Sequence, residues 1–254
     1  MCPFIKIFNQ NIPFYGVCIT IAVMLCASLS IVKAHKFKLM LENMLIIIAS
    51  SVGTGLFSGG LLYIMATYSI EEIYRDIINA DFSFITNGGL VFYGGLLGGI
   101  FGALISAKYL NVKIEILEKC VVPYIPLGHA IGRVGCLMAG CCYGFEYDGI
   151  FSVKNKVYFS TITYFPIQAV EAVLNLLIMQ ILLLYVKKER LRYNVLFCYL
   201  INYSIMRFCI EFFRGDKERG IFMIFSTSQW ISIFIFLFCI IGKKLLYNSS
   251  NNCD

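Results

Sequence analysis

The sequence FYGVCITIAVMLCASLSIV, residues 14–32, is an apolar run of 19 residues that contains no charged side chain. A helix needs about 20 mostly apolar residues to cross the hydrocarbon core of a bilayer. Lys33, His35, Lys36 and Lys38 follow the run, and no small-residue cleavage pattern ends it. We therefore predict a retained transmembrane helix rather than a signal peptide.

The composition of the whole chain agrees with a membrane protein. Of 254 residues, 59% are hydrophobic and only 14% are charged, with a mean hydropathy of +0.78. Soluble domains average about 25% charged residues. Little sequence remains for a separate soluble domain.

Six further apolar runs are long enough to span a bilayer: 44–66, 88–107, 121–140, 166–186, 195–213 and 229–246. Pro123 and Pro126 interrupt the run 121–140, which predicts a broken or partly re-entrant helix. The prediction is an all-α polytopic membrane protein with about seven transmembrane helices, one membrane-embedded domain over residues 1–254, and outer-face loops at 67–87 and 143–165.

The distribution of lysine and arginine predicts the orientation. The loops after the first, third, fifth and seventh runs, including the tail, hold twelve of these residues, and the opposite side holds seven. We expect the N-terminus outside and the C-terminus in the cytoplasm. The net charge of +6 is then a topology signal and does not indicate nucleic-acid binding.

Glycines spaced four apart predict close helix contacts. Gly94, Gly98 and Gly102 form one such series, and Gly55 and Gly59 form another. Small residues at this spacing let helix backbones approach in lipid. The loop over residues 71–84 mixes acidic and apolar residues, which fits either an amphipathic surface segment or a solvated connection.

Ionisable residues inside apolar runs indicate a functional site. Arg133, Glu171, Arg207 and Glu211 lie in such runs, and Arg214 follows at the end of one. Arg207 and Glu211 share a helix face at four-residue spacing, and Glu171 is available to pair with Arg133. A neutralising pair that fixes packing is the simpler reading.

A cavity with two arginines suits a phosphate, since the guanidinium fork matches phosphate oxygens. A phospholipid headgroup is the first expectation for such a cavity. Transport of an ion or small solute is the second, although the sequence has no ring of like charges.

Three cysteines follow Arg133 in the sequence CLMAGCC, residues 136–142. Their spacing matches zinc and iron–sulfur patterns poorly, so no metal site or cofactor is predicted. A disulfide, a thiol with a pKa lowered by Arg133, and tight packing of small residues all remain open.

Several segments, in order, resemble the prolipoprotein diacylglyceryl transferase family. GHAIGRVGCLMAGCCYG, residues 128–144, is similar to the family's Gly-Arg-x-Gly-Asn signature. The other matching segments are IPFYGVCI (12–19), NGGLVFYGGLLGG (87–99), YFPIQAVEA (164–172), MRFCIEFFRGD (206–216) and SQWISI (228–233).

The resemblance implies a multi-pass enzyme of the bacterial cell membrane. Such an enzyme moves the diacylglyceryl group of phosphatidylglycerol onto the lipobox cysteine thiol in the signal peptide of a preprolipoprotein and releases glycerol phosphate. Its partners would be these substrates and membrane lipids.

The resemblance also implies the site residues. The catalytic set would be Arg133, Arg207, Glu211, Tyr93 and Glu171. The substrate-binding set would be Arg133, Arg207, Tyr15, Gln168, Arg214 and His129. In this hypothesis the two arginines of the spans bind the lipid phosphate, and the two glutamates orient them.

The chain departs from the family pattern at five positions. Tyr93 and Phe165 replace histidines, Cys136 replaces asparagine, Cys141 replaces glutamate, and Gly60 replaces arginine. Because a phenol is a poor base at neutral pH, another proton acceptor is needed if the family uses the first histidine. The departures also allow a phospholipid-binding relative that is non-catalytic or catalyses a different reaction.

Overall fold

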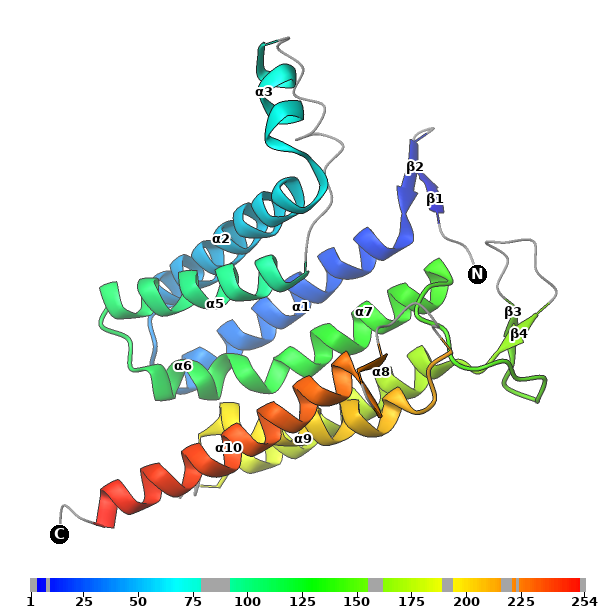
Figure 1. The fold of residues 1–254 in the computed structure, drawn as a ribbon. Helices are drawn as coiled ribbons and strands as arrows, with labels where there is room; N and C mark the ends of the chain where they lie inside the picture. The colour runs from blue at the N-terminus through cyan, green and yellow to red at the C-terminus, as the bar shows by residue number, and fades with distance from the viewer. Residues whose placement is uncertain are drawn as a thin grey trace. The chain divides into compact units, whose positions relative to one another are not determined.

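The structure of the protein is a computed structural model. It describes residues 4–7, 10–78, 92–154, 162–188, 194–215, 221–222 and 224–251. Most of them lie in helices, which Figure 1 shows in chain order: α1 (Phe14–Lys36), α2 (Leu41–Thr67), α3 (Ile70–Ile78), α5 (Phe92–Tyr109), α6 (Ile114–Val121), the 3-10 helix η1 (Val122–Tyr124), α7 (Ile125–Ala139), α8 (Ile167–Val186), α9 (Val195–Glu211) and α10 (Thr227–Asn251).

Three two-stranded antiparallel hairpins lie outside the long helices. They pair β1 (Phe4–Ile7) with β2 (Gln10–Pro13), β3 (Val153–Lys154) with β4 (Thr163–Tyr164), and β5 (Ile221–Phe222) with β6 (Phe225–Ser226). The mainly helical class is thus confirmed, with short strands in the connections that the sequence analysis did not predict.

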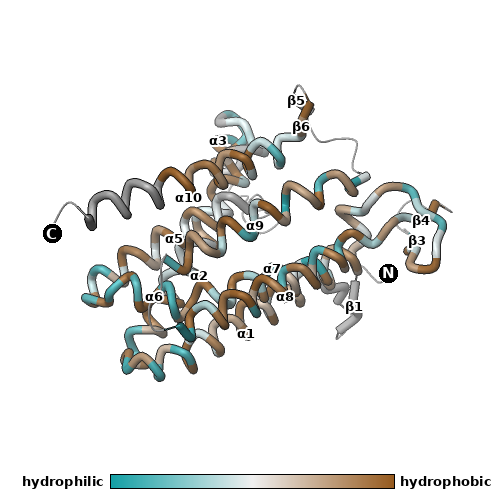
Figure 2. The backbone as a smooth tube through the Cα atoms, turned by 90° about the horizontal axis from the view of Figure 1, so that it is seen from below, coloured by the Kyte–Doolittle hydropathy of each residue, from teal (hydrophilic) through white to brown (hydrophobic). Residues whose placement is uncertain are grey.

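Each predicted apolar run corresponds to a helix. Within the described ranges, four helical segments are long and apolar enough to cross a membrane: Phe14–Lys36, Leu41–Met65, Ile114–Ala139 and Ile167–Val186. Figure 2 shows hydrophobic residues along the length of the helices. Many large apolar side chains on them are exposed, such as Met24, Phe57 and Phe234, as expected for a surface that faces lipid.

The predicted interruption near Pro123 is one turn of 3-10 helix. Pro123 lies inside η1, and Pro126 occupies the first turn of α7, where its missing N–H costs no helical hydrogen bond. The segment Ile114–Ala139 therefore stays continuous enough to count as one candidate span.

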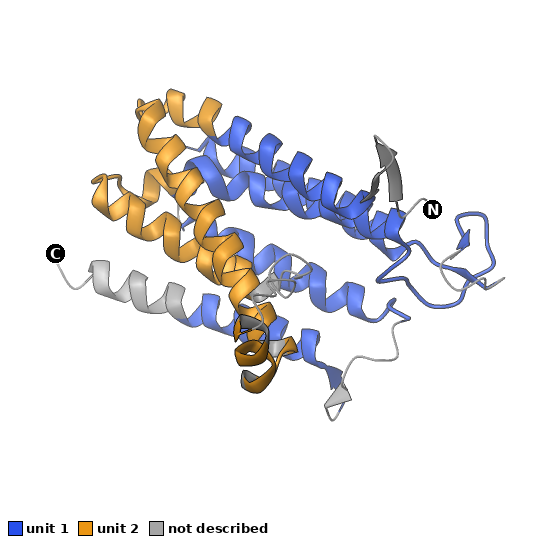
Figure 3. Ribbon diagram, turned by 90° about the horizontal axis from the view of Figure 1, so that it is seen from above, with its two compact units in different colours: residues 1–30, 118–254 blue, residues 31–117 orange. Residues whose placement is uncertain are grey.

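The chain forms two compact units, which Figure 3 shows in different colours. Unit 1 comprises residues 1–30 and 118–254, and unit 2 comprises residues 31–117. In unit 1, α8 packs against both α7 and α9, and α10 packs against α9.

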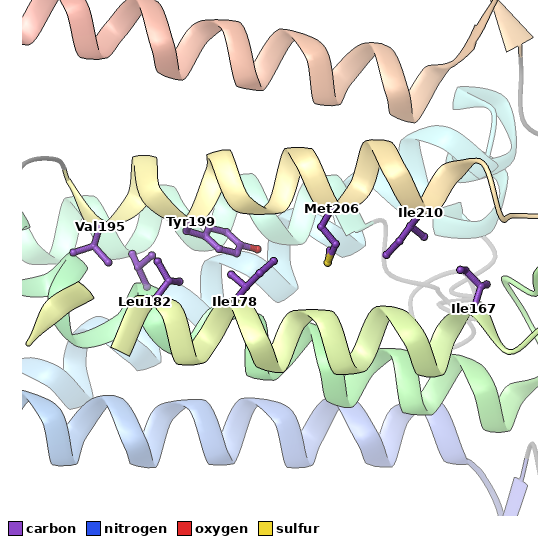
Figure 4. Packing of buried hydrophobic residues seen from close by; sticks show 8 residues of the cluster. Ile167, Ile178, Leu182, Val195, Tyr199, Met206 and Ile210 are labelled. Atoms are coloured by element: carbon purple, nitrogen blue, oxygen red, sulfur yellow. The ribbon is translucent and has the colours of Figure 1, made fainter. Parts of the chain in front are cut away.

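The apolar core of unit 1 lies mainly between α8 and α9 (Figure 4). Ile178 and Leu182 of α8 meet Val195 and Tyr199 of α9 at one end of the interface. Ile167, at the start of α8, is part of the same cluster and is also buried. This core fixes the register between the two helices that carry Glu171, Arg207 and Glu211.

Unit 2 is held together by the predicted glycine series. The hydroxyls of Ser51, Thr54 and Ser58 on α2 donate hydrogen bonds of 2.9, 2.7 and 2.6 Å to the carbonyls of Gly99, Gly98 and Gly94 on α5. Such bonds require the two backbones to approach closely, which small residues such as these allow.

The short helix α3 lies in the predicted loop after α2. Ser69 and Glu72 form a reciprocal capping box, in which the Glu72 carboxylate accepts hydrogen bonds from the Ser69 backbone N–H and hydroxyl at 2.8 and 2.9 Å. These bonds lower the pKa of the Glu72 carboxyl. Part of the predicted amphipathic segment is therefore helical, and residues 79–84 lie outside the described residues.

Gly94 and Gly95 offer a matched test of the helix contact. A Cβ at Gly94 would lie 2.6 Å from the Ser58 carbonyl oxygen, whereas one at Gly95 would have its nearest neighbour at 3.7 Å. We expect Gly94→Ala to destabilise the protein by about 1–3 kcal/mol, the range of overpacking in cores, and Gly95→Ala to be near neutral. Thermal unfolding in detergent measures both, and equal effects would contradict the contact.

Candidate functional site

A chain of four charges joins three helices of unit 1. Arg133 of α7 contacts Glu171 of α8 at 2.9 Å, and the same carboxylate oxygen lies 3.6 Å from Arg207 of α9. Arg207 also contacts Glu211 at 2.8 Å. The expected pairs of Arg133 with Glu171 and of Arg207 with Glu211 are both present, and the bridge from Arg207 to Glu171 is an additional link.

The charges are mostly removed from solvent. Glu171 is 1% exposed, Arg207 and Glu211 are also buried, and the Arg133 side chain is 21% exposed. Burying charges is costly unless they are paired and hydrogen-bonded. The charges of the network sum to zero, since it has two cations and two anions. Arg133 is the most solvent-exposed of the four.

Hydrogen-bonding capacity remains beside these charges. Within the described part of the chain, Gln168 Oε1, Glu171 Oε2 and Arg207 Nη1 are buried and make no hydrogen bond. Most buried polar atoms in proteins have a hydrogen-bond partner, so these three atoms require an explanation. A polar ligand bound beside them would supply the missing partners.

The start of α10 completes the site. Arg207 Nη2 donates a hydrogen bond to Ser228 Oγ at 3.2 Å, and the Ser226 hydroxyl donates one to Glu211 Oε1 at 3.0 Å. Ser226 and Gln229 also form a capping box at the N-terminus of this helix. The sequence analysis did not assign the two serines, although a Ser-x-x-Gln pattern before an apolar run signals such a box.

Gln168 anchors a neighbouring loop. Its amide donates a 2.7 Å hydrogen bond to the carbonyl oxygen of Cys141, and the side chain is 1% exposed. Since Gln168 precedes Glu171 by one turn of α8, the loop after α7 and the charged site are attached to the same stretch of helix.

His129 lies one turn before Arg133 on α7 and faces aromatic residues of α9. Its Nδ1 is 3.2 Å from the Tyr199 hydroxyl, and its ring centroid is 5.3 Å from that of Tyr203. The histidine therefore has protein partners, and its predicted contact with substrate stays a prediction.

Three further predicted residues are not members of the four-charge network. Tyr15 on α1 is 43% exposed and lies against the backbone at Gly135, where an added Cβ would be 3.1 Å from the tyrosine ring. Arg214 follows α9 and forms an isolated β-bridge with Gly144. Tyr93 belongs to α5 in unit 2, and its side chain lies outside the described residues.

The three cysteines come together at the end of α7. The Sγ atoms of Cys136, Cys141 and Cys142 all lie within 4.8 Å of one another. Gly140 ends the helix with a φ of 76°, and Cys142 also has a left-handed φ of 57°. Hydrogen bonds from the other two thiols, with smaller effects of Arg214 and Arg133, lower the pKa of the Cys142 thiol.

Comparison with known proteins gives the family. Residues 3–243 match the model of prolipoprotein diacylglyceryl transferase. The chain is 32% identical over 252 residues to phosphatidylglycerol–prolipoprotein diacylglyceryl transferase 2 of Clostridium perfringens, covering 96% of this chain and 93% of that protein. It is 29% identical to the transferase of Clostridium tetani, covering 90% and 91%, and 26% identical to that of Listeria welshimeri, covering 96% and 90%.

The matched region contains all four members of the charge network and the three clustered cysteines. The similarity extends over nearly the full length of both chains in each of these comparisons. This chain therefore belongs to the prolipoprotein diacylglyceryl transferase family.

Proposed function

We propose that the chain transfers the diacylglyceryl group of phosphatidylglycerol to the lipobox cysteine of a preprolipoprotein and releases glycerol phosphate. The observation that carries the proposal is the convergence of two arginines from different helices, Arg133 and Arg207, on the single carboxylate oxygen of Glu171. The relatives whose names state this activity support it.

In this proposal the two arginines hold one phosphate. Glu171 draws both guanidinium groups to one point, and Glu211 and Ser228 fix the second of them. In the reaction the glyceryl C–O bond breaks, and negative charge grows on the departing phosphate. Fixed donors aimed at developing charge lower the barrier, because they need no reorganisation during the step.

An apolar groove lies between α9, which carries Arg207, and α10, which carries Ser228. It has a volume of about 240 Å³ and is lined by apolar side chains and by Ser204 and Ser232. Ser232 lies one turn beyond Ser228, the partner of Arg207. A lipid whose phosphate meets Arg207 would have an apolar surface here for part of an acyl chain.

The finer features of the proposal rest on the sequence. Seven membrane spans, an external N-terminus and a bacterial cell membrane fit the apolar helices and the lysine and arginine distribution. Tyr15, Gln168, Arg214 and His129 are proposed substrate contacts, and Tyr93 is a proposed catalytic residue.

Replacing the two arginines tests the phosphate site. We expect Arg133→Ala and Arg207→Ala each to lower transfer of labelled diacylglyceryl to a lipobox peptide by at least about 100-fold, the scale seen when one transition-state donor is lost. Arg133→Lys should retain part of the activity, because lysine keeps the charge without the fork.

The matched control is Lys188→Ala, which removes an exposed cation two residues beyond the end of α8, a helix that extends about 22 Å past Glu171. Its activity should equal that of the unmodified protein. Full lipidation by both alanine variants of the arginines, with normal membrane insertion, would disprove the proposed function.

Removing the Glu171 carboxylate tests whether it balances the charge of the two arginines. Glu171→Gln leaves Arg133 and Arg207 without their common anion, so we expect a loss of about 3–5 kcal/mol in stability, as for broken buried pairs. An anionic lipid phosphate can replace part of the lost charge. Phosphatidylglycerol should therefore raise the melting temperature of the variant more than that of the unmodified protein, whereas neutral diacylglycerol should raise both equally. An equal response to phosphatidylglycerol would contradict the proposed balance.

A further inference from the structure

The cluster of Cys136, Cys141 and Cys142 has no part in the charge network, yet its sulfur atoms all lie within 4.8 Å of one another. Among the residues that the structure describes, it is the one group of potential ligand side chains this compact. The spacing of the cysteines in the sequence did not predict a metal site, but the backbone conformation brings the three thiols together. Left-handed conformations at Gly140 and Cys142 turn the chain back over the last turn of α7.

Three hydrogen bonds hold the backbone around the cluster. The backbone N–H of Cys141 donates a 3.2 Å hydrogen bond to the Cys136 carbonyl oxygen, and Gln168 binds the Cys141 carbonyl oxygen at 2.7 Å. Two residues further on, the Gly144 N–H binds the carbonyl oxygen of Phe165 at 3.1 Å. The backbone that carries the three thiols is thus held by hydrogen bonds within the fold.

The surroundings suit a site that carries negative charge. Arg133 lies three residues before Cys136 on α7, so the two side chains share one side of the helix. Three thiolates and one divalent cation have a net charge of −1, which a neighbouring guanidinium group stabilises. In a tetrahedral zinc site the Zn–S bonds are about 2.3 Å, so the sulfur atoms lie about 3.8 Å apart. Side-chain movements of about 1 Å would bring the cluster to that geometry.

We propose that Cys136, Cys141 and Cys142 form a three-thiolate site for one cation of the zinc class, with a fourth coordination position left open. Three protein ligands plus one exchangeable position is the pattern of zinc sites that take part in chemistry. Cys141 is exposed, so the cluster is accessible to an incoming ligand.

A thiol is the class of ligand that fits the fourth position. If the proposed function holds, on which this step rests, that thiol is the acceptor cysteine of the lipobox. Coordination would release its proton to solvent, because a metal-bound thiol is deprotonated. The sulfur lone pair then forms the bond to the glyceryl carbon, while the C–O bond breaks and its electron pair goes to the phosphate. No histidine base is needed at the position of Tyr93.

Cobalt binding tests the site independently of activity. The full chain, purified in detergent, metal-stripped and kept reduced under inert gas, is titrated with Co²⁺. We expect one Co²⁺ per chain, with thiolate-to-cobalt charge-transfer absorption that Zn²⁺ displaces. Cys136→Ser and Cys142→Ser should weaken binding by at least about 100-fold, since even the loss of an outer partner costs about 10–100-fold.

Cys209→Ser is the matched control, because Cys209 is an exposed thiol on α9 outside the cluster. It should bind Co²⁺ as the unmodified chain does. Absence of the charge-transfer band, or the same band in the Cys136 and Cys142 variants, would overturn the site. A disulfide between two of the three cysteines in protein isolated without reductant would also overturn it.

The open position is tested with two lipobox peptides that differ only in cysteine or serine at the acceptor position. The cysteine peptide should shift the cobalt spectrum and the serine peptide should not, and equal spectra would overturn the open position. Transfer activity separates the two proposals. If the chain transfers the lipid but binds no Co²⁺, the proposed function stands and the metal site is disproved. If it binds Co²⁺ but transfers no lipid, the metal site stands and the proposed function is disproved.

Discussion

One carboxylate oxygen, Glu171 Oε1, determines how unit 1 is assembled around its charges. It lies within ion-pair distance of Arg133 on α7 and of Arg207 on α9, and it belongs to the helix between them. Two guanidinium groups in a nonpolar environment repel each other unless an anion separates them. Because the anion is on α8, the three helices can adopt only a register that brings all three side chains to one point. The apolar core between α8 and α9 is consistent with that register.

The two units use different means to hold apolar helices together. Within unit 2, serine and threonine hydroxyls of α2 bind glycine carbonyls of α5, and the helices approach as closely as backbones allow. Within unit 1, large side chains fill the space between α8 and α9, and the charges are confined to one end of that interface. Lipid offers no hydrophobic force between helices, so hydrogen bonds and close packing must supply the contact.

Much of this structure follows from local patterns. The length of the apolar runs predicted every long helix, the glycine spacing predicted close helix contacts at these residues, and four-residue spacing predicted the pair of Arg207 and Glu211. The bridge from Arg207 to Glu171 depends on how two helices pack, which no local pattern specifies. The cysteine cluster depends on a left-handed backbone at Cys142, and residues other than glycine adopt that conformation too seldom for it to be expected.

The hydroxyl of Ser226 serves two structures at once. It caps the first turn of α10, and it donates a hydrogen bond to the carboxylate of Glu211. The cap uses a lone pair of the oxygen, whereas the bond to Glu211 uses the hydroxyl proton, so both bonds form together. The same turn supplies Ser228 to Arg207, so the start of α10 is attached to α9 through both charged residues. Binding of a substrate group that displaces either serine removes one of these attachments, and altered amide exchange at the start of α10 measures the effect.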